Sequence, residues 1–218
     1  MTNSNDRYSR QKDIIPADRI VMYPITVIGI GSIGRQVAIQ AAAIGVRSLK
    51  LIDFDVVEEA NLPVQGYLEA DLGKTKVSAT AELCRAINSD CDITINNRRF
   101  QKSQDKAPVI FCCVDSIQVR KIIWETVGKD CLFFCDTRMA AEVMKILFVT
   151  GNGDREYYPT TLFAEEEAYT GSCTAKSTIY CANIAAALAI SGFTKWLRRI
   201  PVDKDVTLNL LTNDLIVL

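Results

Sequence analysis

The sequence contains no histidine, and none of its eight cysteines belongs to a C-x-x-C pair. The first absence excludes a zinc site with histidine ligands, and the second removes the paired cysteines typical of structural zinc sites. A formal net charge of −1 over 218 residues provides no basic surface for nucleic acid or for an anionic membrane. We therefore expect no zinc, no nucleic-acid partner and no membrane partner.

Long apolar runs are missing as well. The most apolar segment, residues 179–193, is interrupted by Asn183 and Ser191 and is too short for a membrane span. The N-terminus is polar and charged, which gives no sign of a signal peptide. No repeat, low-complexity tract or linker divides the sequence, and its length suits one large domain. We expect a single cytoplasmic domain over residues 1–218.

Half of the cysteines lie in apolar, strand-like runs: Cys112, Cys113, Cys131 and Cys135. In such places a free cysteine usually behaves as a small buried hydrophobe. In a cytosolic chain the expected state is reduced, without disulfides.

A glycine-rich turn between two apolar runs is the strongest positive signal. It completes the pattern G-x-G-x-x-G with Gly29, Gly31 and Gly34, after a β-prone run and before a helical segment. Glycines let the backbone turn tightly and approach a phosphate at a helix N-terminus. A second apolar run, 49–52, ends in Asp53, at the distance where such folds place a ribose-binding acid. Alone, this pattern favours a nicotinamide or flavin enzyme, such as an NAD-dependent oxidoreductase, over any other function; the alternative is a glycine turn that binds nothing.

Further motifs accompany the turn in a fixed order. They are R-Y-S-R-Q at 7–11, D-F-D-V-V at 53–57, N-L-P-V-Q at 61–65, L-G-K-T-K at 72–76, and an apolar run that closes on Asp115. With these motifs the chain resembles the ThiF/MoeB adenylyltransferases and the adenylation domains of ubiquitin-activating enzymes. The resemblance covers nearly the whole sequence and is more specific than the glycine turn. It displaces the oxidoreductase interpretation.

The resemblance implies roles for the matched residues. Asp53 would hold the ribose, Asn61 and Lys76 would contact the phosphates of ATP, and Asp115 would bind Mg²⁺. Arg10 would reach into the site of a neighbouring subunit, which makes a homodimer part of the mechanism. The residues carried over as nucleotide ligands are Gly29, Gly31, Gly34, Asp53, Asp55, Asn61 and Lys76.

One position departs from the family pattern. Val64 stands where the N-x-x-R-Q motif has arginine. The missing guanidinium implies weaker ATP binding, compensation by Lys74, or a degenerate scaffold subunit that pairs with an active partner.

Several of these residues also have plainer interpretations. Lys74 and Lys76 fit solvated lysines in the first turn of a helix that runs to about Ile87. Asp115 fits the N-cap of the next helix, and Arg10 fits a surface charge near a terminus.

Cys173 differs from the other cysteines because it lies in a polar, turn-like segment. A long helix is expected from Thr174 to Trp196, and a thiol at a helix N-terminus gains thiolate character, with Lys176 nearby. The segment also resembles the catalytic cysteine segment of ubiquitin-activating enzymes, which implies a thioester. The alternative is an idle thiol beside a capping hydroxyl. Before it, residues 151–173 are expected to form a long irregular loop, which the resemblance implies is the crossover loop of the family.

The expected fold is α/β, with a Rossmann-like nucleotide-binding sheet and helices on both faces. Its first half is parallel, and antiparallel strands extend it in the second half. Strands are predicted at 132–136 and 143–149, a helix at 116–127, and a terminal hairpin around the turn at 212–214.

The expected function is ATP-dependent adenylation of the C-terminal carboxylate of a ubiquitin-like or sulfur-carrier protein that ends in glycine. An ionised carboxylate is already a nucleophile, so this reaction needs no histidine base, only alignment and neutralisation of phosphate charge. The cofactors would be ATP and Mg²⁺. Whether a conjugating enzyme or sulfur then receives the acyl group stays open.

Overall fold

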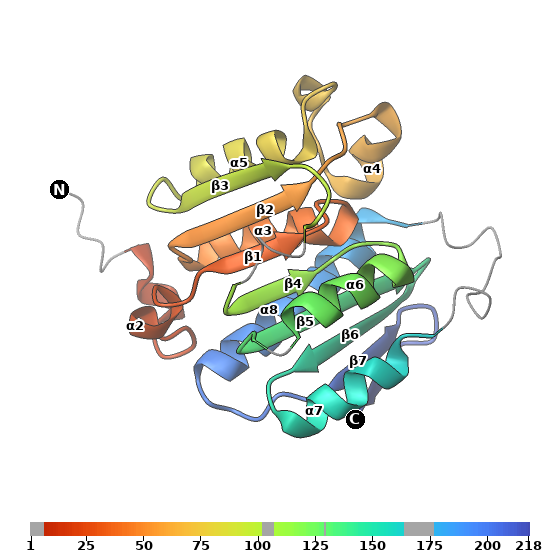
Figure 1. Cartoon of the computed structure of the whole chain (residues 1–218). Helices are drawn as coiled ribbons and strands as arrows, with labels where there is room; N and C mark the ends of the chain where they lie inside the picture. The colour runs from red at the N-terminus through yellow and green to blue at the C-terminus, as the bar shows by residue number, and fades with distance from the viewer. Residues whose placement is uncertain (1–6, 102–106, 129, 164–176) are drawn as a thin grey trace.

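The computed structural model describes residues 7–101, 107–128, 130–163 and 177–218. They form one mixed sheet in the order β3-β2-β1-β4-β5-β6-β7-β8 (Figure 1). The strands are β1 (Ile25–Ile28), β2 (Ser48–Asp53), β3 (Asp92–Asn97), β4 (Val109–Cys112), β5 (Phe133–Ala140), β6 (Val143–Val149), β7 (Asp205–Asn209) and β8 (Asp214–Val217). Strands β1 to β5 pair in parallel, and β6, β7 and β8 continue the sheet antiparallel. This confirms the predicted fold, including the terminal hairpin.

The central strands are apolar because helices cover both of their sides. Every residue of β1 and of β4 is buried, as expected for the middle of a parallel sheet. The edge strand β3 is different: Ile93 is buried, whereas Asp92 and Thr94 are exposed. This largely polar strand was not among those predicted.

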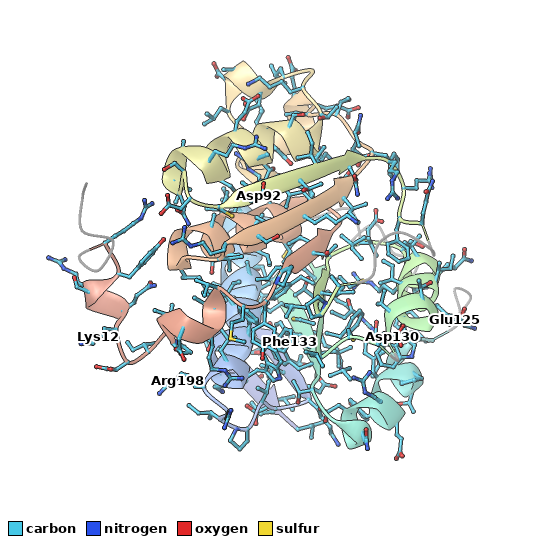
Figure 2. The ribbon with its side chains drawn as sticks, turned by 60° about the vertical axis from the view of Figure 1, so that its left-hand side comes forward. Lys12, Asp92, Glu125, Asp130, Phe133 and Arg198 are labelled. Carbon is cyan, nitrogen blue, oxygen red and sulfur yellow. The ribbon has the colours of Figure 1, made fainter. Side chains whose placement is uncertain are left out.

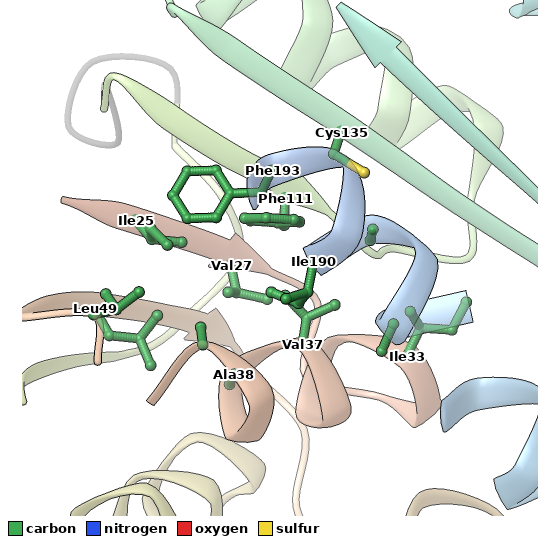
Figure 3. Packing of buried hydrophobic residues seen from close by; sticks show 14 of the residues in the cluster. Ile25, Val27, Ile33, Val37, Ala38, Leu49, Phe111, Cys135, Ile190 and Phe193 are labelled. Atoms are coloured by element: carbon green, nitrogen blue, oxygen red, sulfur yellow. The ribbon is translucent and has the colours of Figure 1, made fainter. Parts of the chain in front are cut away.

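Helices pack on both faces of the sheet, as predicted. One face carries α3 (Ser32–Ile44), α5 (Lys76–Ile87) and α8 (Ile179–Leu197), and the other carries α6 (Ile117–Val127) and α7 (Asn152–Tyr157) (Figure 1). Figure 3 shows the larger core, where Val27 and Phe111 of the sheet meet Val37 of α3 and Phe193 of α8. Within the described ranges, no helix is long and apolar enough to cross a membrane.

Shorter helices complete the described structure. They are η1 (Ser9–Gln11), α2 (Ala17–Ile20), η2 (Glu59–Asn61), α4 (Leu62–Gln65), η3 (Glu69–Asp71) and η4 (Tyr158–Thr161).

The N-terminal segment is anchored at the C-terminal ends of α3 and α5. The amide of Gln11 donates to the carbonyl of Ile44 at 2.8 Å, and Arg7 donates to the carbonyl of Ile87. Lys12 of this segment and Arg198, after α8, line one cavity at this end of the molecule (Figure 2). The R-Y-S-R-Q motif therefore lies far from the N-terminus of α3.

The start of the long C-terminal helix was predicted wrongly. Residue Thr178 is the N-cap of α8, and its hydroxyl accepts the N–H of Cys181 at 3.4 Å, so the helix begins at Ile179 and not at Thr174. The capping threonine lies four residues further along than the predicted start. Cys173 itself lies outside the described residues, and the helix-dipole argument for its reactivity loses its basis.

The predicted irregular stretch after residue 150 also begins as a helix. The carboxylate of Asp154 accepts the N–H groups of Thr150 and Gly151 at 2.9 and 3.0 Å, which caps the first turn of α7. Arg155 then ties this helix to the carbonyls of Gly128 and Cys131. Residues 158–161 of the predicted crossover loop form η4, and its last part, residues 164–173, lies outside the described part of the chain.

The prediction of buried, unpaired thiols is confirmed for three of its four cysteines. Cys112, Cys131 and Cys135 are buried, Cys113 is half-buried, and no described cysteine forms a disulfide. Burial raises the pKa of the Cys112 and Cys113 thiols to about 11, so both are protonated at neutral pH.

Candidate functional site

A pocket of about 670 Å³ lies at the carboxyl ends of the central parallel strands. Its walls include Gly29 after β1, Asp53 at the end of β2, and Asp115 after β4. The strand order reverses between β1 and β4, because β2 lies on one side of β1 and β4 on the other. In open α/β sheets this is where ligands bind, so the topology itself creates the site.

The glycine turn forms one wall of the pocket, and its three glycines meet different constraints. Gly29 has a φ of +86°, and an added Cβ would lie 2.8 Å from the backbone of Cys113. At Gly34 an added Cβ would lie 1.8 Å from the carbonyl oxygen of Gly29. At Gly31 it would meet no atom within 4 Å. Packing therefore requires Gly29 and Gly34, whereas Gly31 leaves open space that fits an approaching phosphate.

Asp53 holds the glycine turn against the end of β2. One carboxylate oxygen accepts the N–H of Ile30 at 2.6 Å, and the other accepts the N–H of Asp55 at 2.8 Å. A carboxylate oxygen has more than one lone pair, so each can accept a further bond from a ribose hydroxyl. The side chain is thus pre-oriented at the pocket wall.

Lys76 and Asp55 form an ion pair in the same wall. Lys76 is the first residue of α5 and is only 7% exposed, and its ammonium lies 2.9 Å from Asp55. The solvated-lysine interpretation is therefore wrong for Lys76. The ammonium has three donors, so it can serve Asp55 and a phosphate together.

Asp115 is exposed at the pocket and is not a helix cap. The N-cap of α6 is Ser116, whose hydroxyl accepts the N–H of Val119 at 3.3 Å. Across the described residues, no group of three or more carboxylate or cysteine side chains could hold a metal. A Mg²⁺ ion at Asp115 would fit the ordinary donor set of one carboxylate, phosphate oxygens and water.

A buried charge network lies behind this part of the pocket. The fully buried Asp136, near the middle of β5, pairs with Arg120 of α6 and with Arg138, whose Nε is 2.9 Å away. The hydroxyl of Tyr158 also donates to Asp136, at 2.9 Å. Burial lowers the pKa of the Arg120 guanidinium, and Arg120 donates to the carbonyl of Val114, next to Asp115. Sequence reasoning missed this network; its signal is the charged residues that follow the apolar start of β5.

Arg98, Arg99 and Phe100 line the pocket and were also missed. They follow β3, the strand that was not predicted. The guanidinium carbon of Arg99 lies 4.3 Å from the centroid of the Phe54 ring.

The structure does not bring every predicted residue to the pocket. Asn61 and Val64 are absent from its walls, although Gln65 is present, and the side-chain oxygen of Asn61 accepts the N–H of Glu58 at 3.0 Å. The ammonium of Lys74 pairs with Glu82 at 2.7 Å, outside the pocket, which argues against compensation by Lys74.

Arg10 also lies outside this pocket, in η1, and is exposed. Its segment contacts the end of α3 that is remote from the glycine turn. A helix of 13 residues spans about 20 Å, so Arg10 is far from the pocket of its own chain.

Known proteins resemble this chain in sequence and in fold. The catalytic subunit of the NEDD8-activating enzyme E1 of Caenorhabditis elegans is 34% identical over 104 residues, which are 45% of this chain and 24% of that protein. The SAMP-activating enzyme E1 of Haloferax volcanii is 33% identical over 104 residues, 45% of this chain and 38% of that protein. The chain thus matches well under half the length of these relatives.

The structural comparison extends over the whole chain. The crystal structure of E. coli MccB with ATP matches this fold with a TM-score of 0.77 at 16% sequence identity. The match covers 99% of this chain and 72% of the MccB chain. This supports the fold. The model of the ThiF family matches residues 9–216. The predicted resemblance is confirmed, and the chain belongs to the ThiF family.

Proposed function

We propose that this protein adenylates the C-terminal carboxylate of a ubiquitin-like or sulfur-carrier protein at the expense of ATP. The observation that carries the proposal is the ion pair of the buried Lys76 with the half-exposed Asp55, beside Gly31 and Asp53 in one pocket. A buried lysine next to a phosphate-sized space suits the binding of a nucleoside triphosphate. The matched relatives include activating enzymes, and MccB, which shares the fold, was solved with ATP.

The reaction follows from the charges in the pocket. A carboxylate oxygen of the carrier protein attacks the α-phosphorus, a new P–O bond forms, and the bond to the leaving pyrophosphate breaks. No proton is removed, so no general base is required. The N–H groups of the glycine turn and the ammonium of Lys76 would stabilise negative charge on the phosphates. Asp115 would hold Mg²⁺, which neutralises phosphate charge when bound.

A scaffold subunit without activity is the second candidate, because Val64 replaces the arginine of the family motif. An NAD-dependent oxidoreductase rested on the glycine turn alone, and family membership favours adenylation over it. Exchange of labelled pyrophosphate into ATP, measured with a ubiquitin-like protein that ends in Gly-Gly, separates the two remaining candidates. Exchange supports the enzyme, and its absence at saturating ATP supports the scaffold.

Adenylation and thioester formation should separate by mutation. We expect Asp115→Ala to lose pyrophosphate exchange and any conjugate, because Asp115 acts in the first step. Cys173→Ala should keep exchange and lose only a reductant-sensitive conjugate with the carrier, because only the second step needs sulfur. The measurement is exchange together with non-reducing gels, with Cys181→Ala as a buried control. A conjugate that survives in Cys173→Ala would assign the nucleophile to another residue.

Arg10 is proposed to act in the site of a second subunit. Arg10→Ala should then lose exchange, and so should Asp115→Ala, but a mixture that forms mixed dimers should recover part of the activity. One site in each mixed dimer has both residues intact. Failure to recover, with mixed dimers demonstrated by native mass spectrometry, would argue against action across subunits.

Replacement by alanine should affect stability at Gly34 and ATP binding at Gly31. Gly34→Ala should lower the free energy of unfolding by about 1–3 kcal/mol, because the new methyl group meets the Gly29 carbonyl. Gly31→Ala should leave stability unchanged, since Gly31 has a φ of −80° and an empty surrounding, but should weaken ATP binding. Thermal unfolding and calorimetry measure the two effects. ATP binding to Gly31→Ala with wild-type affinity would place the phosphates elsewhere.

A further inference from the structure

Three neighbouring strands end side by side at the pocket, and the residues at each end differ in charge and polarity. The glycine turn follows β1, Asp53 ends β2, and Arg98 to Phe100 follow β3. The register aligns Ile28 with Ile52, and Asp53 with Asn97. Adjacent strands lie about 4.8 Å apart, so the three ends form steps across the mouth of the pocket.

This order places the parts of a nucleotide. With phosphates on the glycine turn and ribose on Asp53, as the proposed function requires, the base must lie on the far side of Asp53. That side is the end of β3. Phe54 after β2 and Phe100 after β3 line the pocket, and Val119 and Ile122 of α6 add apolar side chains to its wall.

Arg99 and Phe54 form a flat surface at this position. The guanidinium lies over the ring at 4.3 Å, and Phe54 is 50% exposed although it is a large apolar residue. Among the described residues, Arg99 forms no ion pair. A guanidinium plane on an aromatic ring offers stacking surface to a nucleobase, whose faces are also π systems.

The side of the pocket at the glycine turn has few cationic side chains without a carboxylate partner. The ammonium of Lys76 is matched by Asp55, and the guanidinium of Arg120 is matched by Asp136. Val64 provides no cation, and Lys74 is held outside by Glu82. Most cations near the phosphates therefore already have a carboxylate partner.

We propose that Arg99 and Phe54 form the base-stacking platform of this site, and that nucleotide affinity rests more on the base than on the phosphates. Base stacking then compensates for the arginine that Val64 replaces. The inference rests on the proposed function for the placement of ribose and phosphates. It assigns Arg99 and Phe54 as residues that contact the nucleotide.

Calorimetry with ATP, AMP and adenosine on the full chain tests the platform. For the wild type we expect the affinities for ATP and AMP to agree within about tenfold. Arg99→Ala and Phe54→Ala should each weaken all three ligands by a similar factor of roughly ten. Arg47→Ala is the matched control, because its guanidinium pairs with Asp90 at 3.4 Å and is absent from the pocket wall. Circular dichroism establishes that each variant is folded.

Each result decides between specific alternatives. If Arg99→Ala weakens ATP strongly but AMP and adenosine little, and Arg99→Lys restores ATP binding, Arg99 is a phosphate ligand and the platform is wrong. Unchanged affinities in both variants would also overturn it. A uniform loss in a protein without pyrophosphate exchange supports the platform and rejects the adenylation activity. A wild type that binds none of the three ligands rejects both.

Discussion

Asp136→Asn is expected to lower the free energy of unfolding by about 3–5 kcal/mol. The side chain of Asp136 is fully buried, and two guanidinium groups depend on its charge. The amide of asparagine carries no charge, so Arg120 and Arg138 would keep buried charges without a counter-ion. Removing one partner of a buried ion pair is costly because the remaining charge stays desolvated.

Urea unfolding at neutral pH measures this loss. The matched control is Asp203→Asn, because Asp203 pairs with Lys195 at 3.5 Å and both side chains are more than 40% exposed. An exposed pair of this kind contributes about 1 kcal/mol or less. If Asp136→Asn loses no more than Asp203→Asn, water reaches the network and Asp136 is not its counter-charge.

Lys76→Met should reduce pyrophosphate exchange by roughly 10²–10³-fold. Methionine is of similar length and can fill the buried space in the first turn of α5. The side chain of Asp55 is 45% exposed and stays hydrated when its partner is lost. The expected change in stability is therefore about 1 kcal/mol or less, and the loss of exchange reports on phosphate charge rather than on folding.

Lys74→Met is the control for this prediction. Lys74 lies two residues away, but its ammonium pairs with Glu82 and Asp71 outside the pocket. It should keep the exchange rate of the wild type. Equal losses in the two variants would indicate a general effect of removing positive charge, and would remove Lys76 from its proposed role.

The parts of the fold that local patterns describe were predicted well. The β-prone run, the glycine turn and the helical segment after it are adjacent in sequence, and the structure shows them as β1, the turn and α3, which stops at Gly45 with a φ of +106°. Asp53 was predicted from its spacing after the glycine turn, and Asp115 from the resemblance to the ThiF family; both line the pocket at the carboxyl ends of the parallel strands. Strand β3 was missed because its exposed face is polar and its apolar period is short.

The rest of the site depends on contacts between distant segments. Asp136 meets Arg120 and Tyr158 only after β5, α6 and η4 have packed together. Arg99 reaches Phe54 only because β3 pairs with β2. The start of α8 was misplaced because several hydroxyl residues in this part of the sequence are acceptable caps, and the sequence alone does not single out Thr178, whose hydroxyl accepts the N–H of Cys181. Val64 and Asn61 belong to a recognisable motif, yet their places in α4 and η2 lie outside the pocket walls.

If Arg10 acts in the site of a second subunit as proposed, helix α3 connects the nucleotide site to the subunit interface. Its first turn follows the glycine turn at the pocket, and its last carbonyl, that of Ile44, binds the segment that carries Arg10. Nucleotide binding and subunit association would then act on opposite ends of one element. Thermodynamic linkage makes any such coupling reciprocal: the factor by which nucleotide strengthens association equals the factor by which association strengthens nucleotide binding. With such coupling, the measured affinity for ATP would depend on the protein concentration.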